Sequence, residues 1–571
     1  MNFWKYYLIT IFILIGACQH TPPIQPKKIT EENTKPIQKS EPTERATSYY
    51  YYMKSQLMKR QGDWDKYLKY LRLASEIDPD SEELQNELIK GYIQKRQFED
   101  ALNALTKIIS NTDDNITYCI MLGGVYQALK QYDNAIHTYE IVLEKKPDAK
   151  DVYLILGDLY KKQKQYEKAQ TTYEQLIEIN PKSYAAHYYL GQLAARNEQY
   201  EEAERYLQEA IEIQPNLDQA YFELVHLFKT IKDHDKIIET YQRILSMNPN
   251  HLRALIEFAD FSYINNNKDT ARDLFLKMTN QSKNISILIK QVAGYFYEQN
   301  KYEIMIFALE TIQSISPDEE GIYYFMGSAY EELNKNEIAL QAYKKIPMNS
   351  EYYQSAILHI AYIQQLQGKT NDAIESVQSI LDESDNKSEL YLFLGSIFEE
   401  MDNFEEAEKM FQNGIQHDHA NHRLYFRLGV VYDKWGKKDL SIEQMKKVLE
   451  IDPSNANALN YLGYTYADAG KNLDEAEQLI LEALKYKPGD GYIIDSLGWV
   501  YYKKGDYEKA KKYLEQAIEI VKDDPIILEH VGDVFKKLEN PDKAKEYYER
   551  SIKFQKKEEE RQKVQIKIEK L

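Results

Sequence analysis

The chain has 571 residues, of which 29% are charged and 43% hydrophobic, and its formal net charge is −19 at pH 7. The hydrophobic fraction can fill a core, which excludes a chain that is disordered throughout. Two cysteines exclude a disulfide framework or a cysteine-rich zinc module, and the excess of Asp and Glu argues against a nucleic-acid-binding surface. Scarce glycine and proline beside 49 tyrosines favour a long helical protein.

The first 17 residues have the order of a signal peptide, with one lysine near the start, an apolar run over residues 6–15 and small residues at the end. The apolar run is too short to span a bilayer stably. It leads into a motif that resembles the lipobox of bacterial lipoproteins, Ile15-Gly16-Ala17-Cys18. The resemblance implies acylation of Cys18, and Gln19 resembles the pattern for sorting to the outer membrane. The alternative is an ordinary secretory signal with an incidental cysteine.

Residues 18–47 are predicted to be the lipidated cysteine followed by a proline-rich tether. Five of the chain's sixteen prolines lie there, among Lys, Glu, Gln and Thr. Such a segment cannot bury enough apolar surface to fold, so we expect it to be extended and to hold the folded part away from the lipid. A proline-rich ligand for a groove-binding module is the alternative.

A 34-residue repeat fills almost all of the chain after residue 47. One unit shows the pattern clearly, with Tyr153, Leu156, Gly157, Tyr160, Ala169, Tyr173 and Pro181. Units begin at residue 48 and every 34 residues thereafter, until one extra residue near Asn472 shifts the last two starts to 491 and 525. The spacing predicts fifteen pairs of helices, with small residues where two helices cross and proline at unit boundaries.

This pattern resembles the tetratricopeptide repeat (TPR). The resemblance implies an all-α superhelical solenoid of about fifteen helix–turn–helix units over residues 48–552. Between residues 252 and 318 the pattern departs from the repeat, because Ala259 and Ala293 replace glycine and Met305 replaces alanine. We therefore expect neighbouring units to contact one another less favourably in this segment.

A variable stripe on the first helix of each unit lies apart from the stripe that carries the packing glycine. By resemblance to the repeat family, it lines the concave groove in which peptides bind. In three C-terminal units it carries residue types that are frequent at binding hot spots. These candidate partner-binding residues are Arg423, Phe426, Asp433, Asn457, Asn460, Tyr464, Tyr492, Asp495, Trp499 and Tyr502. Trp499 directly follows Gly498 and is expected to point into the groove. The alternative is that Trp and Tyr pack between neighbouring helices.

Two runs in these units, Asn460–Asp468 (NYLGYTYAD) and Asp495–Tyr502 (DSLGWVYY), carry a narrower resemblance. They are similar to large repeat-built outer-membrane lipoproteins of proteobacteria, over about Gly321–Ser551. One of these is the adaptor that docks a periplasmic C-terminal processing protease and delivers cell-wall hydrolases to it. The resemblance implies a lipid-anchored, periplasm-facing scaffold whose partners are proteins or peptides, including such a protease and its clients. The alternative is an assembly factor for a pilus, secretin or polysaccharide exporter.

Residues 553–571 are predicted to form a charged capping helix. They carry seven basic and four acidic residues around a few apolar ones, Phe554, Val564, Ile566 and Ile568. The end unit of a stacked repeat needs a polar cover, which this helix would supply. A basic arm that binds membrane or nucleic acid is the alternative.

No motif in the chain indicates catalysis. The only histidine cluster, His417, His419 and His422, lies at a junction between units, and His419 takes the place of the proline found elsewhere, so a metal site is the less favoured interpretation. Cys119 is expected to be a small buried hydrophobic residue. Because the repeat leaves no segment for a catalytic domain, we expect no enzyme activity, no catalytic residues, no cofactor, no metal and no nucleic-acid partner.

Overall fold

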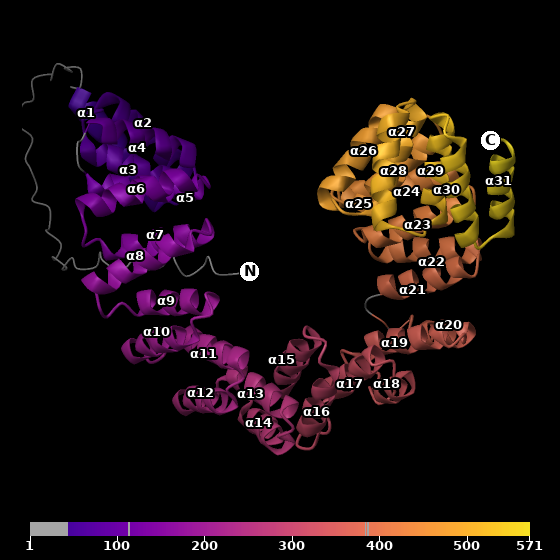
Figure 1. Ribbon diagram of the computed structural model, residues 1–571, viewed down its shortest axis with the longest axis horizontal. Coiled ribbons are helices and arrows are strands. Elements are labelled where there is room, and N and C mark those ends of the chain that lie inside the picture. The colour runs from indigo at the N-terminus through magenta and orange to yellow at the C-terminus, as the bar shows by residue number, and fades with distance from the viewer. Residues whose placement is uncertain (1–43, 112–114, 383, 385–386) are drawn as a thin grey trace, which may run out of the picture. The chain divides into compact units, whose positions relative to one another are not determined.

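The computed structural model describes residues 44–111, 115–382, 384 and 387–571. In this part of the chain helices are the only regular elements, and they are joined one to the next by short connections (Figure 1). The predicted all-α repeat fold is confirmed. The predicted signal peptide, Cys18 and most of the predicted tether lie outside the described residues. Among the described helices, none is long and apolar enough to cross a membrane.

The chain divides into two compact bodies, an N-terminal body that ends at Thr240 and a C-terminal body that begins at Tyr241. The N-terminal body contains the helices α1 (Glu44–Arg60), α2 (Trp64–Ile77), α3 (Glu82–Gln94), α4 (Phe98–Asn111), α5 (Ile116–Ala128), α6 (Tyr132–Lys145), α7 (Lys150–Lys162), α8 (Tyr166–Ile179), α9 (Tyr184–Arg196), α10 (Tyr200–Ile213), α11 (Asp218–Ile231) and the start of α12 (His234–Met247).

The C-terminal body contains the remainder of α12 and all later helices. These are α13 (Leu252–Ile264), α14 (Lys268–Gln281), α15 (Ile285–Tyr297), α16 (Tyr302–Gln313), α17 (Glu320–Glu332), α18 (Asn336–Tyr343), α19 (Tyr353–Leu366), α20 (Thr370–Gln378), α21 (Lys387–Glu400), α22 (Phe404–His417), α23 (His422–Lys434), α24 (Lys438–Ile451), α25 (Ala456–Asp468), α26 (Leu473–Tyr486), α27 (Gly491–Lys504), α28 (Tyr507–Ile520), α29 (Pro525–Lys537), α30 (Pro541–Phe554) and α31 (Glu558–Glu569).

The turn inside each helix pair contains a residue in the left-handed backbone region, as is common where a helix ends, and the α25–α26 turn contains a second one, Asn472. Apart from Asn472, these residues are Gly62, Arg96, Lys130, Lys164, Glu198, Lys232, Asn266, Asn300, Asn334, Gly368, Asp402, Gly436, Gly470, Gly505 and Glu539. They recur every 34 positions as far as Gly470, and the next interval, to Gly505, is one residue longer. The predicted register, including the extra residue near Asn472, is therefore confirmed by the backbone.

The glycine in the first helix of a pair lies under a large side chain of the second helix. A Cβ atom added to Gly123 would lie 2.5 Å from the Tyr139 ring, and one added to Gly532 would lie 2.5 Å from the Tyr548 ring. Both tyrosines are buried in the core. Only a residue without a side chain permits this approach. The predicted helix crossings thus depend on a bulky residue 16 positions after the glycine. The sequence pattern contains this residue, as Tyr173 after Gly157, but does not show that the two are in contact.

Helices α13–α16 keep the helix-pair arrangement although their glycines are replaced. Ala259, Ala293 and Met305 are all fully buried. The buried Asp260 forms an ion pair with Lys301 Nζ at 2.6 Å, and its other carboxylate oxygen has no hydrogen-bond partner among the described residues. A buried acceptor without a partner costs stability. This agrees with the expected weakness of residues 252–318, which stays a prediction.

Both ends of the repeat array differ from the predicted boundaries by a few residues. Helix α1 begins at Glu44 instead of Ser48, and α30 continues to Phe554 before the separate helix α31. Val564 of α31 is fully buried against the last repeat. Lys567 Nζ lies 2.6 Å from Glu529 Oε1 and 2.6 Å from Asp533 Oδ2. Apolar burial and ion pairs therefore hold α31 on α29 and α30.

Candidate partner-binding site

The predicted binding residues lie on the three helices α23, α25 and α27, all in the C-terminal body. The structure divides them by exposure. Arg423, Asn457 and Tyr492 are exposed, Phe426, Asp433, Asn460, Tyr464 and Tyr502 are half-buried, and Asp495 and Trp499 are buried. They are therefore not one continuous accessible surface.

Three of the predicted residues line a cleft of about 350 Å³, which we call the arginine cleft. Its lining residues are Leu392, Ser396, His422, Arg423, Phe426, Arg427, Asn455 and Asn457. Helix α23 supplies the centre, because residues three and four apart on a helix share a face. Arg423, Phe426 and Arg427 therefore line one wall, and α21 and the N-terminal end of α25 supply the others.

The arginine cleft carries positive charge and one unused hydrogen-bond donor. Glu399, which is 2% exposed, accepts a hydrogen bond from Lys434 Nζ at 2.9 Å and forms an ion pair with Arg427 Nη2 at 2.7 Å. Arg423 pairs with Glu389 at 3.2 Å, so three cations meet two carboxylates and one positive charge is left over. The Nε atom of Arg427 is buried and has no hydrogen-bond partner among the described residues. Guanidinium donors beside the Phe426 ring suit a polypeptide that offers carbonyl or carboxylate oxygens and one apolar group.

Trp499 lies between helices instead of in an open groove. Its ring is 7% exposed and stacks on Tyr502 of the same helix, with 4.7 Å between ring centroids, and on His530 of α29 at 4.0 Å. The Nε1 atom of Trp499 has no hydrogen-bond partner among the described residues. The expected exposure of Trp499 is therefore wrong, because the neighbouring repeat covers the ring. Its part in partner binding stays a prediction.

Asp495 also faces the neighbouring repeat, where its Oδ1 lies 2.9 Å from His530 Nδ1. Burial alone would lower the pKa of His530, but the negative charges of Asp495, Asp533 and Glu529 outweigh it and raise the pKa. The ring of Tyr464 lies 6.3 Å from that of His530. Trp499, Tyr502, His530, Asp495 and Tyr464 form the tryptophan cluster, which joins α25, α27 and α29.

The sequence pattern does not single out His530, although a regular spacing could have found it. First helices of adjacent repeats form hydrogen bonds between residues 35 positions apart, as in Asp495–His530, Glu399–Lys434, Tyr188–Glu223 and Tyr297–Glu332. A polar residue on a first helix and a complementary one 35 positions later thus predict a bond between repeats. Arg427 and Glu399 are 28 positions apart, so this rule would still miss them.

The other residues considered in the sequence have ordinary surroundings. His417 stacks on Tyr391 with ring centroids 5.6 Å apart, and within the described ranges no group of three His, Cys, Asp or Glu side chains is placed to hold a metal ion. Cys119 is half-buried and packs against the core of α5–α9 instead of lying wholly inside it.

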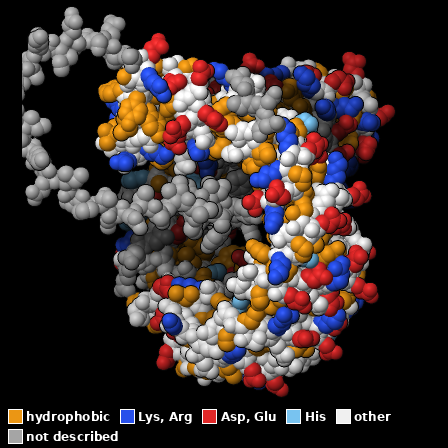
Figure 2. All heavy atoms as spheres, turned by 90° about the vertical axis from the view of Figure 1, so that its left-hand side faces the viewer, with side chains coloured by type: hydrophobic (Ala, Val, Ile, Leu, Met, Phe, Trp, Pro, Cys, Tyr) orange, Lys and Arg blue, Asp and Glu red, His pale blue; other side chains and the backbone are white. Residues whose placement is uncertain are grey.

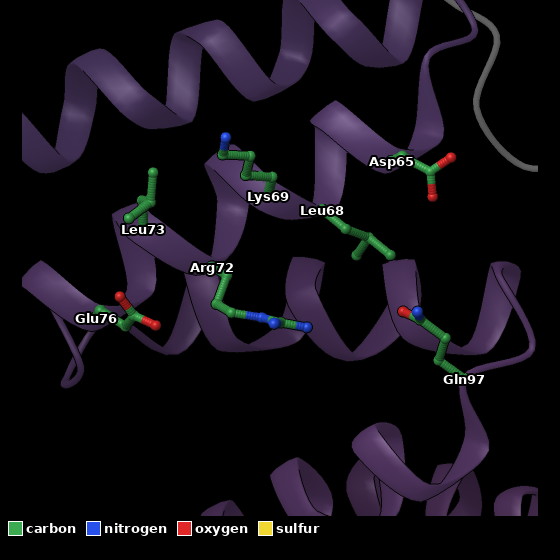
Figure 3. Close-up of a pocket in the computed structure, with 7 residues that line it drawn as sticks. All are labelled: Asp65, Leu68, Lys69, Arg72, Leu73, Glu76 and Gln97. Carbon is green, nitrogen blue, oxygen red and sulfur yellow. The ribbon is translucent and has the colours of Figure 1, made fainter.

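The N-terminal body has a cleft of about 250 Å³ on α2, next to the start of α4 (Figure 3). It is lined by Asp65, Leu68, Lys69, Arg72, Leu73, Glu76 and Gln97. Two acids and two bases balance one another there, and Arg72 Nε already donates to the Tyr92 hydroxyl at 3.0 Å. The arginine cleft is therefore the stronger candidate, because it joins an unused donor to residues that the sequence independently predicts.

Comparison with protein families matches the chain to repeat models in both bodies. The model described as the Tetratricopeptide repeat protein 21 C-terminal ARM domain matches residues 65–260. Two tetratricopeptide-repeat models match residues 454–523 and residues 321–346, 388–416, 422–455 and 527–558. None of these matches covers residues 261–320, which include most of the segment where the repeat pattern departs. No curated protein sequence matches the chain.

Solved structures similar to the chain include the APC/C hetero-tetramer Cut9–Hcn1, at 15% identity over 85% of this chain and 99% of that chain, with a TM-score of 0.36. MamA is 28% identical over 28% of this chain and 95% of its own, with a TM-score of 0.25. The pilF protein of Pseudomonas aeruginosa is 23% identical over 32% and 83%, with a TM-score of 0.29. Because these TM-scores are below 0.5, they carry no argument about function. The helix pairs, their 34-residue register and the repeat-model matches show that the chain belongs to the tetratricopeptide-repeat family.

Proposed function

We propose that this chain is a lipid-anchored periplasmic scaffold at the bacterial outer membrane that binds partner proteins through its C-terminal body and has no catalytic activity of its own. Proteins of the tetratricopeptide-repeat family mediate protein–protein interactions. The observation that carries the proposal is the arginine cleft, where Arg423, Phe426 and Asn457 meet on the surface. Lipid attachment at Cys18 is part of the proposal and is supported by the lipobox-like sequence alone.

The finer proposal is that the scaffold is an adaptor for a C-terminal processing protease. The runs at residues 460–468 and 495–502 support it by resemblance. In this mechanism one stretch of repeats binds the protease and another binds the client. Confinement on one scaffold makes their encounter intramolecular, so the client is cleaved faster without any new catalytic group.

The test is affinity purification of the full chain from its native membranes, with identification of the proteins that bind. The double variant Arg423→Glu with Phe426→Ala should lose partners, because truncating a hot spot costs about 2 kcal/mol or more, roughly thirtyfold in affinity. The matched control is Lys409→Glu on α22, a charge reversal at an exposed lysine outside the cleft. Partner recovery by the double variant equal to that of the control would exclude the arginine cleft as the binding site.

The identity of the recovered proteins separates the candidate functions. A processing protease and its substrates in the eluate support the adaptor, whereas components of a pilus, secretin or polysaccharide exporter indicate an assembly factor. The anchor has its own test, because Cys18→Ser removes the acyl acceptor. Labelling with a fatty-acid analogue should mark the wild type and leave the variant unmarked, and equal labelling would contradict lipid attachment at Cys18.

A further inference from the structure

Helix α1, at the N-terminal end of the described residues, has an outward face that is apolar and that no other described residue covers. Four large side chains on it are half or more exposed: Tyr49 at 64%, Tyr50 at 58%, Met53 at 50% and Leu57 at 51%. Tyr49, Met53 and Leu57 are four residues apart and lie in one row along the helix, with Tyr50 beside it. Figure 2 shows hydrophobic side chains gathered near the top of the face that includes the first helices. We call these four residues the α1 stripe.

The opposite face of α1 is fully used by the fold. Ser48 and Ser55 are buried, Ser48 Oγ donates to the Ala74 carbonyl at 2.9 Å, and Tyr51 and Tyr52 pack against the core of the first repeats. Because this inner face already holds α1 in place, the α1 stripe is not needed for packing within the repeat. Later first helices have the preceding repeat against their corresponding face, whereas no repeat precedes α1 among the described residues.

The charged residues of α1 that flank the stripe are basic. Arg45, Lys54 and Arg60 flank it on the helix, and Glu44 lies on the opposite side by helical spacing. Neither Arg45 nor Arg60 forms an ion pair with a described carboxylate. This local excess of cations contrasts with the net charge of −19 for the whole chain. An apolar stripe with tyrosines and flanking bases is the chemistry that binds the interface of an anionic lipid bilayer.

The same charges argue against a second copy of the chain as the occupant. Two α1 helices packed stripe to stripe in antiparallel order would bring Arg45 of one copy near Arg60 of the other, at both ends of the contact. Like charges placed opposite one another oppose association. An anionic bilayer satisfies the apolar stripe and the cations together.

We propose that α1 is a membrane-contact helix whose stripe inserts into the interface of an anionic lipid surface while Arg45, Lys54 and Arg60 contact the headgroups. This contact is separate from the proposed acyl anchor and from the arginine cleft. It would hold the first repeats against the bilayer, which replaces the separation from the lipid that the tether sequence predicts, and the arginine cleft would be the surface for proteins. A result that excludes partner binding at the arginine cleft therefore leaves the membrane contact of α1 untouched. A result that excludes the membrane contact likewise leaves partner binding untouched.

The experiment places an environment-sensitive dye on the α1 stripe of the full chain. The dye is attached at Met53→Cys, in a chain that also carries Cys18→Ser and Cys119→Ala, and the matched control carries it at Leu366→Cys, which is 61% exposed in the other body. Fluorescence is recorded while phosphatidylcholine vesicles, with or without phosphatidylglycerol, are added. Because the signal is local, binding of another segment to the vesicles does not produce it. Unchanged helical content confirms that the labelled chains are folded.

We expect the emission at position 53 to shift to the blue when vesicles containing phosphatidylglycerol are added. We expect no shift at position 53 with neutral vesicles, and no shift at position 366 with either kind of vesicle. Adding Arg45→Gln and Arg60→Gln should raise the lipid concentration that gives half of the maximal shift about 25-fold, about fivefold for each cation removed. An unshifted dye at position 53, an equal shift at both positions, or an equal shift with neutral vesicles would overturn the proposal. A blue shift without lipid that grows with protein concentration would also overturn it, in favour of a second copy.

Discussion

Replacing Trp499 by alanine should destabilise the C-terminal repeats strongly. Truncation of a buried Trp or Phe typically costs about 3–5 kcal/mol. The Trp499 ring, only 7% exposed, also loses two stacked partners, Tyr502 and His530. Each aromatic pair contributes about 0.5–1.5 kcal/mol beyond the area that it buries. The loss of stability should therefore lie in the upper half of the range of about 3–5 kcal/mol. Trp499 Nε1 has no partner among the described residues, so the loss of a hydrogen bond adds nothing.

Hydrogen exchange is the suitable measurement, because repeats of a solenoid open locally and a single melting temperature would average over all of them. Amides of α25, α27 and α29 should exchange faster in Trp499→Ala, while those of α7–α10 should not change. The matched control is Tyr492→Ala on the same helix, where the side chain is 55% exposed and the expected cost is at most about 0.5 kcal/mol. Trp499→Phe keeps a stacked ring without the unpaired donor and should lose less than half as much as alanine.

The packing role of Trp499 is refuted if the free energy of opening of α27 in Trp499→Ala lies within about 0.5 kcal/mol of that in the wild type, as is expected for the Tyr492→Ala control. Such a result would mean that the ring contributes no packing energy. If partner recovery then fell at least thirtyfold, Trp499 would be a binding anchor despite its burial. A destabilised Trp499→Ala that still recovers partners normally would instead assign the residue to packing alone.

The packing and the charges lead to three further expected outcomes. Because the pKa of His530 is raised in the folded state, its contribution to the free energy of unfolding is complete below its ordinary pKa of 6.5 and is lost as pH rises through the folded pKa. The free energy of opening of α27 and α29, measured by hydrogen exchange, should therefore fall as pH rises through this range more steeply in wild type than in His530→Gln, and parallel curves would contradict this. Gly532→Ala should lower the free energy of unfolding by about 1–3 kcal/mol, because the added methyl group presses on the Tyr548 ring. Gly294→Ala has nothing within 4 Å of the added Cβ and should stabilise α15 by about 0.5–1 kcal/mol. Denaturant unfolding measures both changes. Residues 252–318 should exchange amide hydrogens faster than residues 150–215, and uniform protection across both segments would refute the expected weakness.

The fold is largely predictable from the sequence because its determinants are local and periodic. One 34-residue pattern specifies two helices, and the left-handed turn residues from Gly62 to Glu539 repeat with the predicted register and the predicted single insertion. Helix boundaries are less certain, as at Glu44 and Phe554, because the end turns of a helix fray and depend on the segments packed against them. The pairing of Gly123 with Tyr139 is equally periodic, but it becomes visible only when both helices of a pair are considered together.

The candidate site is less predictable. The spacing of residues along a helix shows to which side of the helix they point, but it does not show which of them the neighbouring helix covers. Arg423 and Trp499 occupy the same kind of variable position, yet Arg423 is exposed and Trp499 is buried. The difference comes from the next repeat. The repeat after Trp499 offers His530, whose ring stacks on the indole and whose Nδ1 pairs with Asp495. The repeat after Arg423 offers Asn457 instead, a short side chain that leaves the cleft open. Aromatic residues on this stripe can therefore be assigned to a binding surface only when the residues about 31 to 35 positions later are considered as well, because those residues decide whether the stripe is accessible to a partner.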